Sequence, residues 1–350
     1  MTELVNPSVS QLSAFPKTLL GHYPTPLELL PRLSEDYPGH NLYVKRDDCT
    51  GLGMGGNKVR QLEFYLGDAV AKGCDTVLST GAIQSNYMRT IAAAASKLGL
   101  DCHIQLEDRV PDKSEEYHTS GNRLLSSIFG ATISYFPEGG DEEAADAEIN
   151  GIAEQLTNQG KKPYVVPLKP VKQPKGALGY IECAKELLDQ CVAQSLIPDL
   201  IVVGSGSGMT HSGLLFGLRL LGADVSVLGA CVRREAKLQG PRVYGHCQNL
   251  EEMLGTTNTV TEGDVWVDDG VLAPGYGQMS DFVKATIHRV ATREGLLLDP
   301  VYSGKSLACL LNRINTDQFS EFKNIVFIHT GGTPAIFAYQ KEMSDLGSPN

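Results

Sequence analysis

The chain of 350 residues has no apolar run long enough to span a membrane, and its first residues, with Glu3 among them, lack the apolar segment of a signal peptide. Basic residues are not in excess, and the net charge of −11 argues against nucleic acid and anionic membranes as partners. The eight cysteines form no Cys-x-x-Cys pair, which argues against a zinc site and a disulfide framework. These absences predict a cytoplasmic protein that acts on a small molecule and holds no metal.

Apolar residues make up 42% of the chain, enough for the cores of two ordinary domains. Short strand-like runs alternate with helical patterns, which predicts an α/β fold with two open, mostly parallel sheets flanked by helices. The first and last strands have similar character. We therefore expect a larger domain of residues 1–58 plus 171–350, a smaller inserted domain of residues 59–170, and a ligand between them.

Each expected element has a range. Residues 1–40 should form an arm, and residues 232–275 have an irregular pattern. The expected strands are 41–45, 75–79, 101–106, 131–135, 163–166, 199–203, 225–230 and 324–328. The expected helices are 61–70, 86–98, 120–129, 141–159, 179–191, 210–221, 278–294 and 304–314.

Lys58 stands where a glycine-rich loop, residues 51–56, gives way to a helix. Glycines let a backbone approach a ligand closely, and a helix start supplies unpaired N–H groups. A lysine amine that is desolvated there becomes a nucleophile suited to carbonyl chemistry. Alone, the motif favours a flexible loop with a solvated lysine over a catalytic lysine.

Residues 204–210, Gly-Ser-Gly-Ser-Gly-Met-Thr, follow an expected buried strand and open a helix. Their N–H groups would suit one phosphate, although a tight turn without a ligand has the same pattern. Met209 stands where a dinucleotide fingerprint requires glycine, and no Lys-Ser or Lys-Thr pair closes the loop as in a Walker motif.

Four further loops carry polar side chains: residues 80–86, 274–277, 299–305 and 329–334. Ser85 or Asn86 would cap a helix or donate to an anion, and Tyr276 and Tyr302 would cover core or face a ligand. Ligands of open α/β sheets bind at the carboxyl ends of strands, where we expect these loops and residues 204–210 to meet.

The segments GGNKVRQLEF, GAIQSN, GSGSGMTHSG, PGYG, LLLDPVYSGKS and FIHTGGTPAIFAY resemble pyridoxal-phosphate enzymes of the tryptophan-synthase-β-like fold, also called fold type II. The closest subgroup is the D-cysteine desulfhydrase and 1-aminocyclopropane-1-carboxylate deaminase family, and L-cysteate sulfo-lyase is similar. The resemblance runs in order from about Pro24 to Tyr339. It implies pyridoxal 5′-phosphate between the two domains, with the larger domain holding the cofactor, and we expect a homodimer.

The resemblance also implies a role for each matching residue. Lys58 would bind the cofactor covalently and move protons at the substrate α-carbon. Ser85 would bind the substrate carboxylate, with Asn86 at the cofactor ring oxygen. The remaining assignments are Asn57 as a cofactor contact, Ser207, Gly208, Met209 and Thr210 as the phosphate cradle, Tyr276 and Tyr302 beside the substrate, and Ser303 at the pyridine nitrogen.

Two departures from the deaminase pattern bear on the substrate. Ser303 stands where those deaminases carry glutamate, and a neutral hydroxyl makes the ring a weaker electron sink, which suits expulsion of a good leaving group. Tyr87 stands where they carry glutamine, next to the expected carboxylate contact. Ser303 favours a carbon–sulfur lyase over a ring-opening deaminase, whereas Tyr87 leaves the carboxylate contact, and with it the substrate, open.

The predicted reaction is therefore β-elimination from D-cysteine, giving sulfide, pyruvate and ammonia. The alternative is L-cysteate as substrate, giving sulfite, and a cyclopropane deaminase comes third. A catalytically silent cofactor-binding protein is disfavoured by the intact Lys58, Ser85, Tyr276 and Tyr302. A sulfonate would need an extra cation, for which the sequence offers Arg89, Arg109, Arg233 and Arg234.

Overall fold

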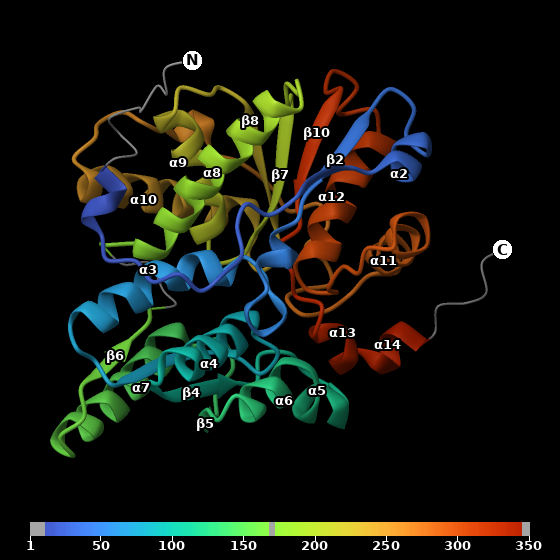
Figure 1. Cartoon of the computed structure of the whole chain (residues 1–350). Helices are drawn as coiled ribbons and strands as arrows, with labels where there is room; N and C mark the ends of the chain where they lie inside the picture. The colour runs from blue at the N-terminus through green and yellow to red at the C-terminus, as the bar shows by residue number, and fades with distance from the viewer. Residues whose placement is uncertain (1–10, 168–171, 345–350) are drawn as a thin grey trace.

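The computed structural model describes residues 11–167 and 172–344, which form two sheets with helices around them (Figure 1). In the larger sheet the strand order is β1-β2-β10-β7-β8-β9, and every pair is parallel except β1 with β2. The smaller sheet has the order β5-β4-β3-β6 and is parallel throughout. The predicted α/β class with two mostly parallel sheets is confirmed.

The strands of the larger sheet are β1 (Leu27–Leu29), β2 (Asn41–Lys45), β7 (Leu200–Ser205), β8 (Ser226–Cys231), β9 (Trp266–Asp268) and β10 (Asn324–Ile328). Those of the smaller sheet are β3 (Thr76–Ala82), β4 (Asp101–Glu107), β5 (Thr132–Phe136) and β6 (Pro163–Val165). The main helices are α2 (Pro31–Glu35), α3 (Lys58–Ala71), α4 (Asn86–Leu98), α5 (Glu115–Thr119), α6 (Gly121–Ile128), α7 (Glu142–Asn158), α8 (Lys175–Ala193), α9 (Met209–Leu220), α10 (Ala236–Leu254), α11 (Asp281–Glu294), α12 (Ser303–Asn315), α13 (Ala335–Ala338) and α14 (Gln340–Ser344).

The strands of the larger sheet are apolar on both faces because helices cover both. In β7, Ile201 and Val203 pack into one core with α8, α9 and α10, whereas Leu200 and Val202 pack into a second core with α11 and α12. Successive strand residues point to opposite faces, so a continuous apolar run fills both cores. Figure 1 shows the two groups of helices on opposite sides of β7 and β10.

The smaller sheet is built from residues 76–165 and lies below the larger one in Figure 1, with α3 between them. Helix α4 packs its alanines, together with Ile91, against β3 and β4. It ends at Gly99, whose positive φ of 70° closes the last turn. Helix α3 contacts both α4 and α8, so it joins the two halves of the molecule.

Nearly all expected elements are present, with ends shifted by a few residues. The interpretation of residues 232–275 as irregular was wrong, because they form α10 and β9. Pro241 lies inside α10, and polar residues such as Gln239 and His246 occupy its buried positions, so the apolar period of the helix was concealed. The expected domain boundary at residue 171 lies outside the described residues. No helix within the described ranges is long and apolar enough to cross a membrane.

Candidate active site

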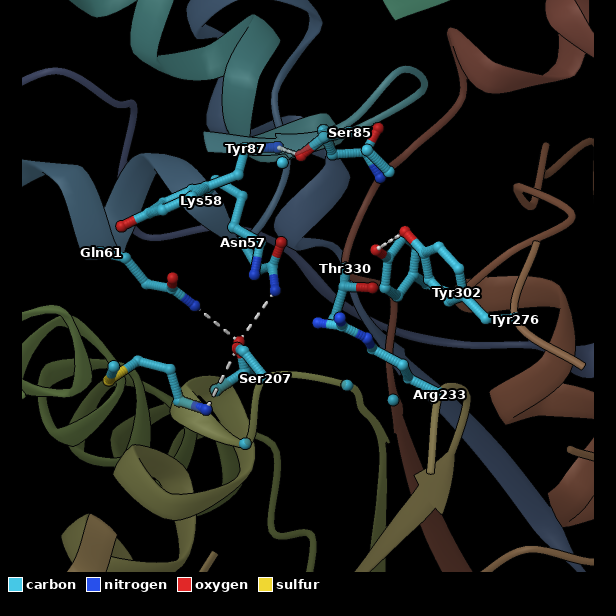
Figure 2. Close-up of a pocket in the computed structure, with 18 of the residues that line it drawn as sticks. Asn57, Lys58, Gln61, Ser85, Tyr87, Ser207, Arg233, Tyr276, Tyr302 and Thr330 are labelled. Atoms are coloured by element: carbon cyan, nitrogen blue, oxygen red, sulfur yellow. Dashed lines mark hydrogen bonds between the residues drawn. The ribbon is translucent and has the colours of Figure 1, made fainter. Parts of the chain in front are cut away.

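A cavity lies between the two sheets, and loops from both halves of the chain line it (Figure 2). Most of the loops follow strands, namely β2, β3, β4, β6, β7, β8, β9 and β10, as expected for a ligand site at the carboxyl ends of parallel strands, whereas the loop with Tyr302 follows α11. The residues that line it are Asn57, Lys58, Gln61, Gly81, Ala82, Ser85, Asn86, Tyr87, Arg109, Pro167, Gly204, Gly206, Ser207, Gly208, Met209, Thr210, Arg233, Tyr276, Tyr302 and Thr330.

Lys58 is the first residue of α3, and its side chain is largely removed from solvent. Its ammonium nitrogen lies 5.4 Å from the centre of the Tyr87 ring, and it forms no ion pair among the described residues. Burial without a countercharge lowers the pKa of Lys58 to about 8, because the charged form loses hydration. A substantial fraction of the amine is therefore neutral near physiological pH, as a nucleophile or a base requires.

The loop after β7 turns into α9 at Gly208, which has a φ of 92° and precedes Met209, the first helical residue. The first turn of any helix leaves N–H groups without intrahelical partners, and here they face the cavity wall formed by residues 207–210. Arg242 Nε donates to the carbonyl oxygen of Ser207 at 2.9 Å, and His246 lies 3.1 Å from the same oxygen. These contacts fix the loop from the side away from the cavity.

Thr210 is the last residue of the cavity wall formed by residues 207–210, and two hydrogen bonds fix the direction of its hydroxyl proton. Its hydroxyl oxygen accepts from Asn57 Nδ2 and from Gln61 Nε2, each at 2.8 Å. Two incoming donors occupy both lone pairs, so the hydroxyl proton of Thr210 remains for a third partner. Figure 2 shows Asn57 and Gln61 pointing toward the loop that carries Ser207.

Ser85 is the N-cap of α4: its hydroxyl oxygen accepts from the N–H groups of Tyr87 at 3.2 Å and Met88 at 3.4 Å. The capping role that the sequence left open is therefore present, and its hydroxyl proton stays available to a ligand. The next residue, Asn86, accepts from Asn122 Nδ2 at 2.9 Å through its side-chain oxygen. This contact leaves the amide NH₂ of Asn86 as a donor at the cavity wall.

Tyr276 and Tyr302 meet at the opposite wall, with their hydroxyl oxygens 2.8 Å apart (Figure 2). Burial, followed by the neighbouring Tyr276, raises the pKa of Tyr302 well above its ordinary value, so Tyr302 stays protonated. The turn that carries Tyr276 is held by Lys305 Nζ, which donates to the carbonyl oxygens of Leu272 at 2.8 Å and Gly275 at 2.6 Å.

Ser303 does not line the cavity. Its hydroxyl donates to Asp299 Oδ1 at 2.6 Å and accepts from the Asp299 N–H at 2.7 Å, which commits it to the turn before α12. Thr330, which the sequence analysis did not select, lines the cavity instead and follows β10. Thr330 could have been identified from the sequence, because it follows the last strand in the loop of residues 329–334, which we expected at the carboxyl ends of the strands.

Of the four arginines suggested by the sequence, Arg109 and Arg233 line the cavity and Arg89 and Arg234 do not. Arg89 is fully buried and structural, because it donates to Asn122 Oδ1 at 3.0 Å and to the carbonyl oxygen of Gly55 at 3.1 Å. Gly204 and Gly206 of the expected phosphate loop and Gly81 and Ala82 of the loop of residues 80–86 also line the cavity, together with Gln61 and Pro167, which the sequence did not single out.

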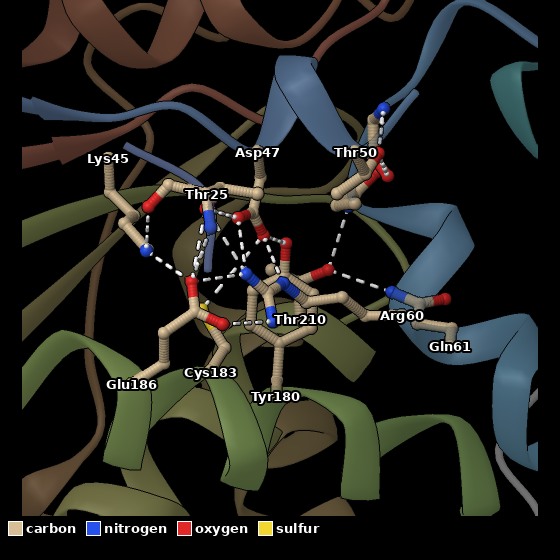
Figure 3. Close-up of polar contacts among 12 residues, drawn as sticks. Thr25, Lys45, Asp47, Thr50, Arg60, Gln61, Tyr180, Cys183, Glu186 and Thr210 are labelled. Atoms are coloured by element: carbon tan, nitrogen blue, oxygen red, sulfur yellow. Dashed lines mark hydrogen bonds and ion pairs between the residues drawn. The ribbon is translucent and has the colours of Figure 1, made fainter. Parts of the chain in front are cut away.

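A buried polar network anchors α3 just beyond Lys58 (Figure 3). Arg60 donates to both carboxylate oxygens of Asp47, each at 2.9 Å. Tyr180 adds a hydrogen bond of 2.6 Å from α8, and Thr25 adds one of 2.8 Å from the N-terminal arm. Burial opposes ionisation of Asp47, yet Arg60 holds the pKa of this carboxyl below its ordinary value. The network fixes the start of α3 and hence the position of Lys58.

The donor set fits pyridoxal phosphate. A partly neutral lysine amine and a phosphate cradle line one cavity, and Asn86 offers an amide NH₂ in the same cavity. The fit rests on three groups: the Lys58 amine can bind an aldehyde, the Asn86 amide a ring oxygen, and residues 207–210 a phosphate. Among the described residues no group of three or more His, Cys, Asp or Glu side chains could hold a metal ion.

Comparison with known proteins agrees with this donor set. A family model described as "Pyridoxal-phosphate dependent enzyme" matches residues 18–331. A D-cysteine desulfhydrase of Salmonella paratyphi A is 44% identical over 328 residues, which is 94% of this chain and 97% of the relative. The corresponding enzyme of Salmonella typhi is 43% identical over the same shares.

Solved structures show the same fold. A structure described as an ACC deaminase homologue superposes with a TM-score of 0.86 at 36% identity and covers 97% of this chain and 98% of its own. O-ureido-L-serine synthase superposes with a TM-score of 0.66 at 19% identity, covering 97% of this chain and 96% of its own, which is evidence for the fold alone.

Proposed function

Because the chain belongs to the family of pyridoxal-phosphate-dependent enzymes, we propose that it is a carbon–sulfur lyase that releases sulfide from D-cysteine. The observation that carries the proposal is one cavity lined by Lys58, by residues 207–210 and by the Tyr276–Tyr302 pair, in a chain whose curated relatives are D-cysteine desulfhydrases. Such a reaction belongs to amino-acid catabolism and sulfur metabolism.

When bound, the cofactor supplies an aldehyde that takes up the substrate amine and a conjugated ring that withdraws electrons from the α-carbon. The backbone of residues 207–210 and the Thr210 hydroxyl would hold its phosphate, and the amide of Asn86 would donate to its ring oxygen. Lys58, whose pKa is lowered to about 8 by burial, accepts the α-proton as a general base. Ser85 donates its hydroxyl proton to the substrate carboxylate.

The tyrosine pair acts at the β-carbon. Tyr302 is protonated and can donate to the Tyr276 oxygen, which directs the Tyr276 proton into the cavity toward the leaving sulfur. The net reaction takes D-cysteine and one water to pyruvate, ammonia and hydrogen sulfide: the Cβ–S bond breaks, its electron pair leaves on sulfur, and no oxidant is needed.

A second candidate is L-cysteate, from which sulfite would leave in place of sulfide. Arg109 and Arg233 favour it, because both line the cavity and a sulfonate requires a cationic partner. Ser303 as the pyridine partner remains a prediction, and its hydroxyl bond to Asp299 supports Thr330 as a further candidate for that contact.

The proposal extends to the organisation of the molecule. The division into residues 1–58 plus 171–350 and residues 59–170 is supported by the two sheets, which use separate stretches of the chain. A cytoplasmic homodimer is supported by eight cysteines that are all free and by exposed apolar side chains at Leu124 and Ile128 of α6. Light scattering after gel filtration tests the dimer.

The activity is tested with D-cysteine, L-cysteine, L-cysteate and 1-aminocyclopropane-1-carboxylate as separate substrates of the holoenzyme. Sulfide, sulfite, pyruvate and 2-oxobutyrate are measured, with Lys58→Ala as the control for uncatalysed release. We expect sulfide and pyruvate from D-cysteine and negligible 2-oxobutyrate. Production of 2-oxobutyrate without sulfide or sulfite would refute a carbon–sulfur lyase, and no turnover of any substrate would support a silent binding protein.

A further inference from the structure

A buried guanidinium without a counterion lies close to the cavity wall that carries Asn86. Arg89 belongs to α4, three residues after Asn86, and its side chain is fully buried. It forms no ion pair among the described residues, and burial lowers its pKa to about 10, so it stays charged at neutral pH. Arginine is almost never fully buried without a partner. The groups that accept from Arg89 must therefore compensate its charge.

The acceptors of Arg89 are neutral and come from two places in the chain. Nη1 and Nη2 both donate to the carbonyl oxygen of Gly55 at 3.1 Å, and Nη1 also donates to that of Gly53, in the loop before Lys58. Nε donates to Asn122 Oδ1 of α6 at 3.0 Å. A guanidinium can donate but cannot accept, so the oxygen of the Asn122 amide has to face it.

The direction of the Asn122 amide is passed on to Asn86. With its oxygen toward Arg89, the amide turns its NH₂ group the other way, where Nδ2 donates to Asn86 Oδ1 at 2.9 Å and to the carbonyl oxygen of Gln84 at 3.0 Å. Asn122 is fully buried, and both protons of its NH₂ group are used. The amide of Asn122 therefore has a single orientation.

The surroundings of Asn122 hold it against Asn86. Its backbone N–H donates to Gln84 Oε1 at 2.9 Å, and Gln84 Nε2 donates to the carbonyl oxygens of Tyr117 at 2.5 Å and Ser120 at 3.0 Å. Gly121 has a φ of 56°, and a Cβ there would lie 2.6 Å from Gln84 Oε1. The start of α6 is thus fixed beside the loop that leads into α4.

Asn86 is the last member of this chain of hydrogen bonds and lines the cavity. An asparagine amide can present either its oxygen or its NH₂ group to a ligand. Here the oxygen is occupied by Asn122, so the NH₂ group remains. Each bond from Arg89 to Asn122 to Asn86 runs in the same donor-to-acceptor direction, and bonds in such a chain polarise and strengthen one another.

We propose that Arg89 and Asn122 are positioning residues that commit Asn86 to donate its amide N–H to the ring oxygen of the cofactor. The inference rests on the role of Asn86 in the proposed function. Neither Arg89 nor Asn122 lines the cavity, and both act through Asn86. A reversed Asn86 amide would set its oxygen against the ring oxygen, which removes a hydrogen bond and leaves two acceptors facing each other.

The binding test uses two ligands that differ only in the ring oxygen. Pyridoxine 5′-phosphate has an alcohol in place of the aldehyde and forms no covalent bond with Lys58, and its 3-deoxy derivative lacks the ring oxygen. Fluorescence titration of the protein freed of cofactor gives Kd for each. We expect wild type to bind pyridoxine 5′-phosphate about tenfold more tightly or better. Equal affinity for the two ligands would overturn the proposal without recourse to any variant.

Asn122→Asp reverses the direction of the chain while it keeps the shape of the side chain. The new carboxylate is a counterion for Arg89, but it cannot donate to Asn86 and accepts from its NH₂ group instead. The preference for pyridoxine 5′-phosphate should fall about tenfold, whereas general damage to the fold would weaken both ligands alike. Asn158→Asp makes the same change of charge at the exposed end of α7 and should keep the wild-type preference. An unchanged preference in Asn122→Asp, with a wild-type circular dichroism spectrum, would overturn the proposal.

Substitution of Arg89 gives a second route to the same answer. Glutamine in Arg89→Gln can accept as well as donate, so it no longer dictates the orientation of Asn122, and its charge is absent. The preference for pyridoxine 5′-phosphate should fall, and Arg89→Lys, which keeps a cation that only donates, should restore part of it. A wild-type preference in Arg89→Gln would show that Arg89 does not set the direction of the chain.

Asn86→Ala separates this inference from the function on which it rests. A preference lost in Asn86→Ala but retained in Asn122→Asp would refute the positioning role and leave Asn86 at the ring oxygen. A preference unchanged in Asn86→Ala would refute both. Sulfide release from D-cysteine by the wild-type holoenzyme is measured separately. Its absence, together with a preference lost in Asn86→Ala and Asn122→Asp, would support the positioning role and refute the lyase.

Discussion

The hydroxyl oxygens of Tyr276 and Tyr302 lie 2.8 Å apart at the wall of the cavity that contains Lys58. Because burial and its neighbour keep Tyr302 protonated, Tyr302 can hold the Tyr276 oxygen and direct the Tyr276 proton inward. The pair therefore presents one oriented proton donor to a departing group, which is the arrangement that β-elimination requires at the leaving atom.

Removal of that donor should slow the chemical step. We expect Tyr276→Phe to lower kcat for sulfide release by about 10²-fold, the lower range for loss of a positioned acid, while the affinity for pyridoxal phosphate stays unchanged. Steady-state kinetics with D-cysteine measures the effect, and the exposed Tyr135→Phe is the matched control. An unaltered kcat in Tyr276→Phe would exclude it as the proton donor.

Thr210 should contribute to cofactor affinity through its hydroxyl proton. Thr210→Val keeps the shape of the side chain but removes the donor and leaves the amides of Asn57 and Gln61 without their acceptor. A lost hydrogen bond to a charged group costs about 1.5–3 kcal/mol, so Kd for pyridoxal phosphate should rise about 10- to 100-fold. Fluorescence titration of the apoprotein measures Kd, and Thr210→Ser should remain near wild type. Equal Kd values for the Thr210→Val variant and the wild-type protein would show that Thr210 does not contact the phosphate.

The Asp47–Arg60 pair should be a large contributor to stability. Asp47→Asn leaves the buried Arg60 with Glu186 as its charged partner and with the hydroxyl of Thr25, and removal of one member of a buried pair costs about 3–5 kcal/mol. Urea denaturation gives the free energy of unfolding, and Asp189→Asn in the exposed pair with Lys185 should change it by less than about 1 kcal/mol.

The same pair has a defined pH dependence. The pKa of Asp47 is lowered in the folded state, so its contribution is fully present above the unfolded value of about 3.9 and is lost as pH falls through the folded value. The stability difference between wild type and Asp47→Asn should therefore shrink below about pH 4. A difference that is constant from pH 3 to 7 would contradict ionisation of Asp47 in the folded protein.

Lys58 should react with the cofactor at a lower pH than an ordinary lysine. Because burial lowers its pKa to about 8, the neutral fraction of the amine rises up to that pH and then levels off. Stopped-flow absorbance of apoprotein mixed with pyridoxal phosphate should show a rate that increases about tenfold from pH 6 to 7 and is level above about pH 9. Acetyl-lysine methyl ester in the same buffers should continue to accelerate beyond pH 9, and a protein profile that follows it would mean a solvated Lys58.

The sequence predicted those parts of the site that depend on one segment of chain. The Lys58 loop and residues 204–210 each contain their glycines, their donors and the start of their helix within a few residues, so local rules locate them. The N-cap role of Ser85 likewise depends on the next three residues. Helix α10 was missed because its buried face includes Gln239 and His246, and their polar character is compensated by partners distant in sequence.

Features that depend on tertiary packing could not be predicted. Arg109 and Arg233 are 124 positions apart, and they line one cavity although β4 and β8 belong to different sheets. The sequence contains four arginines that could bind a sulfonate and gives no basis for choosing among them, and two of these four line the cavity in the structure. Ser303 at the pyridine nitrogen stays a prediction, and the bond of its hydroxyl to Asp299 in the turn before α12 is a contact that spacing alone does not reveal.

The most direct test of the account is the identity of the residue that binds the cofactor. The purified holoenzyme is reduced with borohydride, digested and analysed by mass spectrometry, with Lys58→Ala and Lys305→Arg treated in parallel. We predict a pyridoxyl adduct on the peptide that contains Lys58, an absence of any adduct in Lys58→Ala, and a Lys58 adduct in Lys305→Arg. A visible absorption band and a reduced adduct that persist in Lys58→Ala would contradict the assignment of this cavity as the active site.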